Sequence, residues 1–150
     1  MHIPARVDYG MRALLQLAAS DEPLTADELA AAQDLPVRFL RAILSDLRRA
    51  GILSSQRGVS GGFHLARPAD QVTVADVIRT LDGPLAEVRG SRPNDLTYEG
   101  AATYLRTVWV ATRSAMRLVL EGTTLADVVA GQFSDQVQGL VDNPEAWKPH

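Results

Sequence analysis

Residues 36–51 read PVRFLRAILSDLRRAG, and this stretch decides the fold. Proline suits the first turn of a helix, where its missing N–H is no loss, and Gly51 suits the left-handed position after the last turn. At about 100° per residue, the apolar side chains point one way and the arginines point the other way. The apolar side holds Leu40, Ile43, Leu44 and Leu47, and the opposite side holds Arg38, Arg41, Ser45, Arg48 and Arg49. The spacing predicts a helix that is anchored by one face and presents a basic face outward.

The segments around this helix complete a small head. Ile52–Gln56 and Phe63–Ala66 are candidate strands on either side of the glycine-rich RGVSGG of residues 57–62, which predicts a hairpin. Upstream, an apolar stripe predicts a helix from about residue 6 to residue 19. The capping box TADE at residues 25–28 predicts the start of a second, short helix.

The rest of the chain is also predicted to be helical. Thr73 caps a fourth helix, which ends at the Asp-Gly-Pro of residues 82–84. Residues 98–121 contain no proline and are apolar over most of the helix circumference, so we expect a helix of about 36 Å that is buried on several sides. Thr124 caps a short final helix. We therefore expect a head at residues 1–85, a polar linker at 86–97, and a long helix with a C-terminal helical region at 98–150.

Charge is unevenly distributed along the chain. The formal net charge is −3, but the segment from Leu35 to Arg67 carries six arginines against the single acid Asp46. A basic face on an otherwise acidic chain is typical of nucleic-acid binding.

A short helix, a turn, a basic helix and a glycine-tipped hairpin follow one another as in a winged helix-turn-helix. That arrangement places the basic helix in the major groove of double-stranded DNA. The residues expected to contact DNA are Arg38, Arg41, Ser45, Arg48, Arg49, Arg57, Gly58, Gly61 and Gly62.

Several classes of protein are excluded by composition. The chain has no cysteine, so disulfides, a thiol nucleophile and thiolate-bound zinc or iron–sulfur clusters are excluded. His2 and His64 have no partner at metal-ligand spacing, and no catalytic set of nucleophile, base and orienting residue is visible. We expect no metal, no cofactor and no enzymatic activity. The sequence also shows neither a membrane-spanning segment nor a signal peptide, so we expect a cytoplasmic protein.

The head resembles the Rrf-two-type family of bacterial transcriptional regulators, to which IscR, NsrR and CymR belong. The resemblance is carried by YGMRALLQLA at residues 9–18, by FLRAILSDLRRAGIL at residues 39–53, and by RG, GGF and LARP at residues 57–58, 61–63 and 65–68. It is strong through residue 85 and weaker over the long helix and the TLAD of residues 124–127. It implies a homodimer in which the long helices cross and each head reads half of a palindrome.

The sequence departs from the family pattern at three places. The wing tip is Val59-Ser60 where the family often has Pro-Gly, and Arg41 stands where several members place a glutamate that reads bases. These two differences predict an operator sequence that differs from those of the best-known members of the family. The sensors of the family place three cysteines in the segment that corresponds to residues 86–100, whereas this chain has none. The resemblance therefore implies a member without the iron–sulfur cluster.

The apolar excess of the long helix agrees with a homodimer, because one small head cannot cover it. The residues expected at the dimer interface are Leu105, Val108, Trp109, Thr112, Met116 and Val119. Two hypotheses follow. The first is a homodimeric repressor that reads a palindromic operator through helix 36–50 and wing 52–66, and the alternative is a winged-helix protein-interaction module that acts through a partner protein. Four alternatives stay open for the signal that controls the regulator: a small-molecule effector, a protein effector, oxidation of methionine, or no signal at all.

Overall fold

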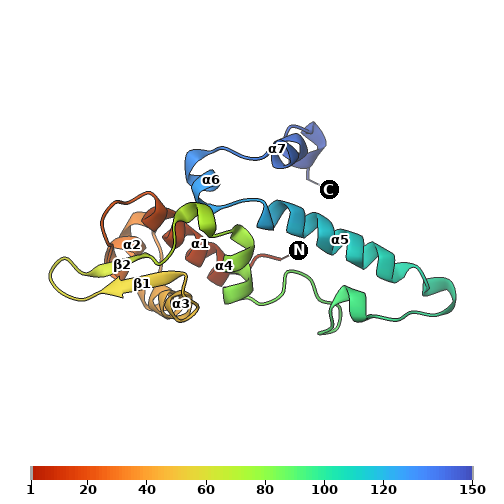
Figure 1. The fold of residues 1–150 in the computed structure, drawn as a ribbon, viewed down its shortest axis with the longest axis horizontal. Coiled ribbons are helices and arrows are strands. Elements are labelled where there is room, and N and C mark those ends of the chain that lie inside the picture. Colours follow the sequence, from red (N-terminus) through yellow and green to blue (C-terminus); the bar gives the residue numbers. More distant parts are fainter. Residues whose placement is uncertain (1, 150) are drawn as a thin grey trace.

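The computed structural model describes residues 2–149, which form seven α-helices, a two-stranded sheet and four 3₁₀ turns (Figure 1). The predicted fold class, mainly helical with a small β-hairpin, is confirmed. The helices are α1 (Ala5–Ala18), α2 (Ala26–Gln33), α3 (Val37–Arg49), α4 (Val74–Leu81), α5 (Leu105–Glu121), α6 (Leu125–Ala130) and α7 (Asp135–Val141). The strands are β1 (Leu53–Gln56) and β2 (Gly62–Leu65), and the 3₁₀ turns are η1 (Ala69–Gln71), η2 (Pro93–Asp95), η3 (Gly100–Ala102) and η4 (Pro144–Trp147).

Helices α1 to α4 pack around one apolar core, which forms the head. Each of them contributes side chains without exposed surface, including Leu14 of α1, Leu29 of α2, Leu44 of α3 and Val77 of α4. Leu14, Leu44 and Val77 lie on the apolar stripes that the helical spacing of the sequence predicted, whereas α2 was predicted from its capping box alone. The core therefore holds α3 by one face and leaves its other face at the surface.

Side-chain caps start three helices where the sequence predicted a capping threonine. At α2, the backbone N–H of Thr25 donates to Glu28 Oε2 at 2.7 Å, and the backbone N–H of Glu28 donates to Thr25 Oγ1 at 3.2 Å. Thr73 and Thr124 form the same reciprocal pair with aspartates three residues later, at the starts of α4 and α6. These caps satisfy amides that have no partner within the helix, which fixes where each helix begins.

The hairpin is antiparallel, with Leu53 opposite Leu65 and Gln56 opposite Gly62. Leu24, in the loop between α1 and α2, exchanges two backbone hydrogen bonds with Phe63, at 3.0 and 2.7 Å. This bridge attaches the hairpin to the head. The loop that joins β1 and β2 projects at one end of the molecule, opposite the end toward which α5 extends (Figure 1).

The linker and α5 form an arm that projects from the head (Figure 1). After α4, the chain runs alongside α5 to the far end of the arm and then returns as α5. Two hydrogen bonds join the two passes: Trp109 Nε1 donates to the Tyr98 hydroxyl at 3.2 Å, and Arg113 donates to Asn94 Oδ1 at 2.8 Å.

The prediction that the long helix starts at residue 98 was wrong. Gly100 has a φ of +58°, in the left-handed region, and residues 100–102 form a 3₁₀ turn. The α-helix begins only at Leu105 and has 17 residues, so it is about 26 Å long at 1.5 Å per residue. The single glycine supplies the turn at the end of the arm, because a left-handed residue cannot continue a right-handed helix.

The chain returns to the head after α5. Leu125 of α6 is fully buried, and its backbone N–H donates to the carbonyl of Val72 at 2.9 Å. The N–H of Val74 donates to the carbonyl of Thr123, also at 2.9 Å. The core of the head therefore includes residues that lie about 40 positions beyond the expected boundary at residue 85.

The last helix, α7, was not predicted from the sequence. It is capped by Ser134, whose Oγ accepts from the N–H of Val137 at 3.4 Å, and it buries none of its residues. Over residues 2–149, no helix combines the length and the apolar character that crossing a membrane requires.

Candidate nucleic-acid interface

Helix α3 presents the predicted basic face. Its apolar residues Leu40, Ile43, Leu44 and Leu47 have no exposed surface. On the opposite side Arg38, Arg41, Arg48 and Arg49 are exposed, and Ser45 is half-buried. The structure thus brings the five predicted α3 residues onto one surface, and the buried leucines hold that surface in place.

The arginines of this face differ in their present partners. Arg41 pairs with Asp27 of α2 at 2.7 Å, with both side chains more than 60% exposed. Arg49 pairs with Asp46 at 2.8 Å, and Asp46 also pairs with Arg6 of α1. Exposed ion pairs contribute only about 0–1 kcal/mol, so a phosphate or a base can replace Asp27 at Arg41 with little loss of stability.

Arg48 connects α3 to the hairpin. One of its guanidinium nitrogens donates to Ser55 Oγ of β1 at 3.2 Å. Arg38 and Arg57 are exposed and have no ion-pair partner within residues 2–149. The helix and the hairpin therefore offer their arginines side by side, and three of these cations, Arg38, Arg48 and Arg57, have no competing carboxylate within residues 2–149.

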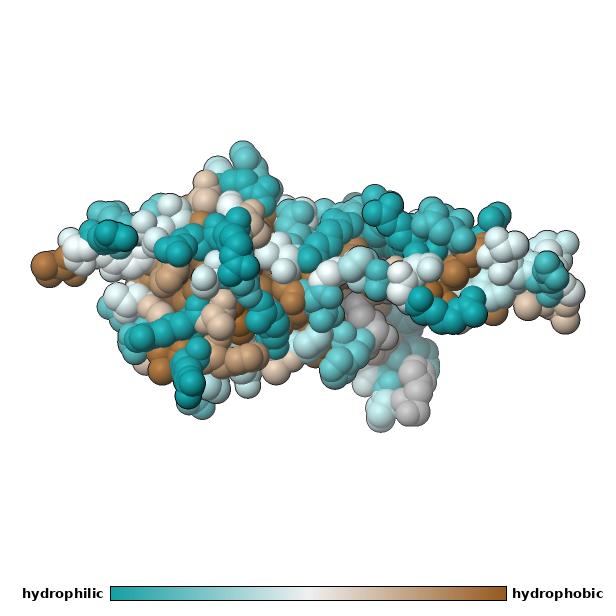
Figure 2. Space-filling model, turned by 90° about the horizontal axis from the view of Figure 1, so that it is seen from below, coloured by the Kyte–Doolittle hydropathy of each residue, from teal (hydrophilic) through white to brown (hydrophobic). Residues whose placement is uncertain are grey.

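The loop of the hairpin is narrow and exposed. Gly58 has a φ of +115°, which favours glycine, and Val59 at the tip is fully exposed. Figure 2 views the molecule from the side on which α3 lies and shows a hydrophobic residue at this tip and hydrophilic side chains standing out over the head. The tip can approach a partner molecule without obstruction from the head.

Gly61 and Gly62 are required by contacts inside the chain. A Cβ on Gly61 would lie 2.4 Å from the carbonyl oxygen of Gln56, and a Cβ on Gly62 would lie 2.7 Å from the carbonyl carbon of Leu24. Both obstructing atoms belong to the backbone and cannot rotate away. These two glycines therefore allow the hairpin to close on itself and on the loop between α1 and α2, a role that the sequence did not reveal.

The six residues predicted at a dimer interface divide into two groups on α5. Leu105, Trp109, Met116 and Val119 are half-buried within their own chain, whereas Val108 and Thr112 are exposed. Val108 belongs to a second apolar stripe with Tyr104, Ala111, Ala115 and Leu118, all of which are exposed. No residue of α5 is buried. One side of α5 thus packs against the linker and α4. The stripe of Tyr104, Val108, Ala111, Ala115 and Leu118 has no partner within residues 2–149.

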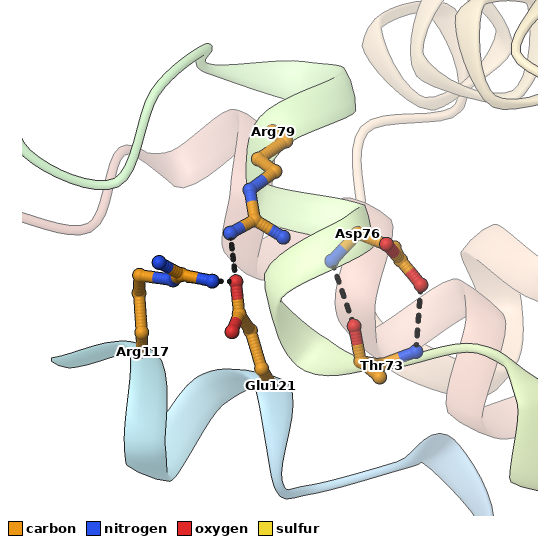
Figure 3. Close-up of polar contacts among 5 residues, drawn as sticks. All are labelled: Thr73, Asp76, Arg79, Arg117 and Glu121. Atoms are coloured by element: carbon orange, nitrogen blue, oxygen red, sulfur yellow. Dashed lines mark hydrogen bonds and ion pairs between the residues drawn. The ribbon is translucent and has the colours of Figure 1, made fainter. Parts of the chain in front are cut away.

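Sequence reasoning missed a second group of cations, at the junction of head and arm. Arg79 of α4 and Arg117 of α5 both donate to Oε1 of Glu121, with 2.9 Å between Arg117 Nε and this oxygen (Figure 3). These two hydrogen bonds, with that of Arg117 the larger cause, lower the pKa of Glu121 to about 2. The link between α4 and α5 is therefore fully present above pH 4.5 and is lost as the pH falls through about 2. Only the i, i+4 spacing of Arg113, Arg117 and Glu121 was a signal in the sequence.

Comparison with known proteins identifies the family. The family model Rrf2, described as an iron-dependent transcriptional regulator, matches residues 3–131. A Mycobacterium tuberculosis protein named as an HTH-type transcriptional regulator is 47% identical over 148 residues, which cover 97% of this chain and 92% of that protein.

Solved structures agree with this assignment. CymR, the global cysteine regulator of Bacillus subtilis, superposes with a TM-score of 0.76 at 29% identity, over 88% of this chain and 98% of that one. IscR of T. potens superposes with a TM-score of 0.69 at 27% identity, over 100% of this chain and 93% of that one. These proteins are transcriptional regulators rather than enzymes, and the predicted winged helix-turn-helix architecture is confirmed. The chain belongs to the Rrf2 family of DNA-binding transcriptional regulators.

Proposed function

We propose that this protein is a homodimeric repressor that binds a palindromic operator in double-stranded DNA. The observation that carries the proposal is the exposed arginine face of α3, held beside the hairpin by the contact between Arg48 and Ser55. Residues 1–85 act as the DNA-binding unit, residues 86–97 as the linker, and residues 98–150 as the long dimerisation helix and a C-terminal helical region, from which α6 completes the core of the head. Because its ligand is chromosomal DNA, we place the protein in the cytoplasm.

Each residue of the interface has a proposed role. Arg38 and Arg41 lie in the N-terminal half of α3, the half that usually reaches base edges, and a guanidinium can donate two hydrogen bonds to one guanine. Ser45 lies between them and the phosphate contacts Arg48 and Arg49. Arg57 reaches a phosphate or the minor groove, and the wing of Gly58, Gly61 and Gly62 brings backbone close to the DNA.

The second chain of the dimer covers α5. The exposed stripe around Val108 supports a two-fold contact, because a helix that is apolar on two sides needs a partner on each. Thr112 is exposed beside this stripe, and Leu105, Trp109, Met116 and Val119 flank it on the side that faces the linker and α4. Crossing the two α5 helices places one α3 helix in each half of the operator.

The residues of this chain do not fit an iron site, although the family description implies iron. The chain contains no cysteine, and residues 2–149 include no group of three histidine, cysteine, aspartate or glutamate side chains that could hold a metal ion. A thiolate-bound cluster cannot form without thiolates. We therefore propose regulation without an iron–sulfur cluster.

The experiment that tests this function is a selection from random duplexes with the purified protein. Anisotropy titration of the enriched duplex at several salt concentrations follows. We expect a palindrome, with an affinity that falls on a double-logarithmic salt plot by about 0.9 per phosphate contacted. Absence of an enriched sequence, together with weak binding at low salt, would reject the operator-binding repressor in favour of a protein partner at the basic face.

Arg41→Ala is expected to weaken binding to the selected operator by about 1–3 kcal/mol and to relax the preference at one base pair. Losing one guanidinium removes a bidentate base contact, and the loss of its exposed pair with Asp27 changes stability little. Anisotropy titration against the operator and its single-base variants measures both effects.

Asp27→Ala is the matched control, because it breaks the same ion pair and keeps Arg41. We expect Asp27→Ala to bind the operator as tightly as the wild type or more tightly. An equal loss for Arg41→Ala on every duplex would show a phosphate contact instead of base reading.

A further inference from the structure

A cavity at the junction of head and arm is lined by four arginines. It has a volume of about 410 Å³, which lies within the range of small-molecule sites. The four arginines are Arg79 from α4, Arg92 from the linker, and Arg113 and Arg117 from α5. Residues 83–86 complete the lining, which includes no acidic residue. Three segments that are far apart in the sequence therefore place guanidinium groups around one space.

The positive charge of this cluster is only partly neutralised. Within residues 2–149, Glu121 is the one carboxylate within 4.0 Å of these arginines, and it pairs with Arg79 and Arg117 (Figure 3). Arg113 donates to the uncharged amide of Asn94 at 2.8 Å, and Arg92 has no ion-pair partner in the described chain. Four cations against one carboxylate leave three positive charges, which repel one another unless an anion binds.

Structural roles that involve a neighbouring charge or dipole account for two of the four arginines. Arg79 lies in the last turn of α4, where the helix dipole favours a cation. Arg117 and Glu121 are separated by four residues on α5, a common stabilising pair on a helix surface. Arg113 joins α5 to the linker through the uncharged amide of Asn94, and Arg92 has neither of these roles. Arg92 and Arg113 therefore extend the cluster around the cavity and add charge without a carboxylate.

We propose that this cavity binds a small organic molecule with at least two negative charges, carried by phosphate or carboxylate groups. The planar guanidinium matches both groups because it can donate two parallel hydrogen bonds to a pair of oxygens. Pro84 and Leu85 line the same cavity and provide apolar contact for the carbon skeleton of such a molecule.

The position of the cavity makes this anion the effector of the regulator, an inference that rests on the proposed function. Helix α4 contacts α1 and α3 in the head, and α5 forms the arm. An anion held by Arg79, Arg92 and Arg113 at once bridges the two parts and favours one orientation of the head on the arm. In a dimer, that orientation sets the distance between the two α3 helices, which must match half-sites about one helical turn of DNA apart. The anion changes DNA affinity by binding one orientation more tightly than the other.

The test is isothermal titration calorimetry on the full chain, with sodium pyrophosphate and sodium citrate as probes and sodium chloride at matched ionic strength as the blank. We expect one pyrophosphate or citrate to bind per chain. Saturation by pyrophosphate alone assigns the site to phosphates, and saturation by citrate alone assigns it to carboxylates. If neither probe gives saturable binding, the proposed site is wrong.

Arg92→Gln and Arg113→Gln are expected to weaken this binding by about tenfold or more, because each removes a charge-assisted contact. Arg89→Gln is the matched control. Arg89 lies in the same linker and is exposed, but it does not line the cavity. An equal loss in Arg89→Gln would show that the anions only screen the general charge. A monomeric Arg92→Gln protein would show that the arginine cluster stabilises the dimer instead of binding an anion.

A separate measurement distinguishes this inference from the proposed function. Operator affinity is measured with and without the bound probe, and we expect a change of about fivefold or more in the wild type and none in Arg92→Gln. Operator binding without any binding of pyrophosphate or citrate would overturn the effector site alone. Anion binding by a protein that binds no DNA would overturn the repressor alone.

Discussion

Val108→Asp is expected to convert the dimer into a monomer and to lower the affinity for a full palindrome by about 10²- to 10⁴-fold. Val108 is 53% exposed in the single chain and lies in the middle of the apolar stripe of α5. In the proposed dimer, the substitution buries a carboxylate without a partner at the two-fold contact, which is strongly unfavourable. Once the heads are separate, the second half-site is no longer bound intramolecularly, and the gain from bivalency disappears.

Val110→Asp is the matched control for this prediction. Val110 is also exposed, at 41%, but two residues on a helix turn the side chain by about 200°, away from the stripe of Val108. We expect Val110→Asp to remain dimeric with unchanged operator affinity. Sedimentation equilibrium measures the mass, and anisotropy measures the affinity. A dimeric Val108→Asp protein would place the interface elsewhere, and monomers from both variants would show that any charge on α5 is disruptive.

Leu125→Ala is expected to lower the free energy of unfolding by about 2–5 kcal/mol. Leu125 is fully buried in the core of the head, although it lies in α6 after the arm. Removing its side chain leaves a cavity in the core that α1 to α4 share. Urea denaturation, followed by circular dichroism, measures the change at constant protein concentration, which matters because dimerisation also stabilises the fold.

Leu140→Ala tests the same substitution outside the core. Leu140 in α7 is 54% exposed, and substitutions at such positions usually change stability by about 0.5 kcal/mol or less. Equal effects of the two substitutions would contradict the structural assignment of α6 to the head. A small effect of Leu125→Ala alone would show that the head is complete within residues 1–85.

Local chemistry explains which parts of the structure were predictable. The capping threonines Thr25, Thr73 and Thr124 each act on an amide three residues later, so their sequence context contains the whole interaction. The two faces of α3 follow from the helical repeat alone. The hairpin followed from its glycine-rich loop, although the strand boundaries differ by one residue from those expected. The arginine face of the candidate interface was therefore visible before the fold was known.

The structure differs from the predictions made from the sequence where segments that are far apart in the sequence come into contact. Leu125 reaches the head core from beyond the arm, and the backbone of Leu24 explains why residue 62 must be glycine. The four arginines of the cavity come from α4, the linker and α5, and no spacing in the sequence relates Arg79 or Arg92 to Arg113. The apolar residues of α5 were recognised, but the sequence could not show which of its two stripes packs within the chain.

The sequence by itself determined helices α1 to α4 and α6, the three threonine caps, the basic face of α3 and the family. The tertiary structure alone decided the closure of the head by α6, the division of α5 into a covered and an open side, and the arginine cavity. The physical reason is the separation along the sequence of the residues that interact. Caps and helical repeats are interactions between residues three or four positions apart, whereas the cavity and the core depend on how the chain returns to itself over 20 residues or more.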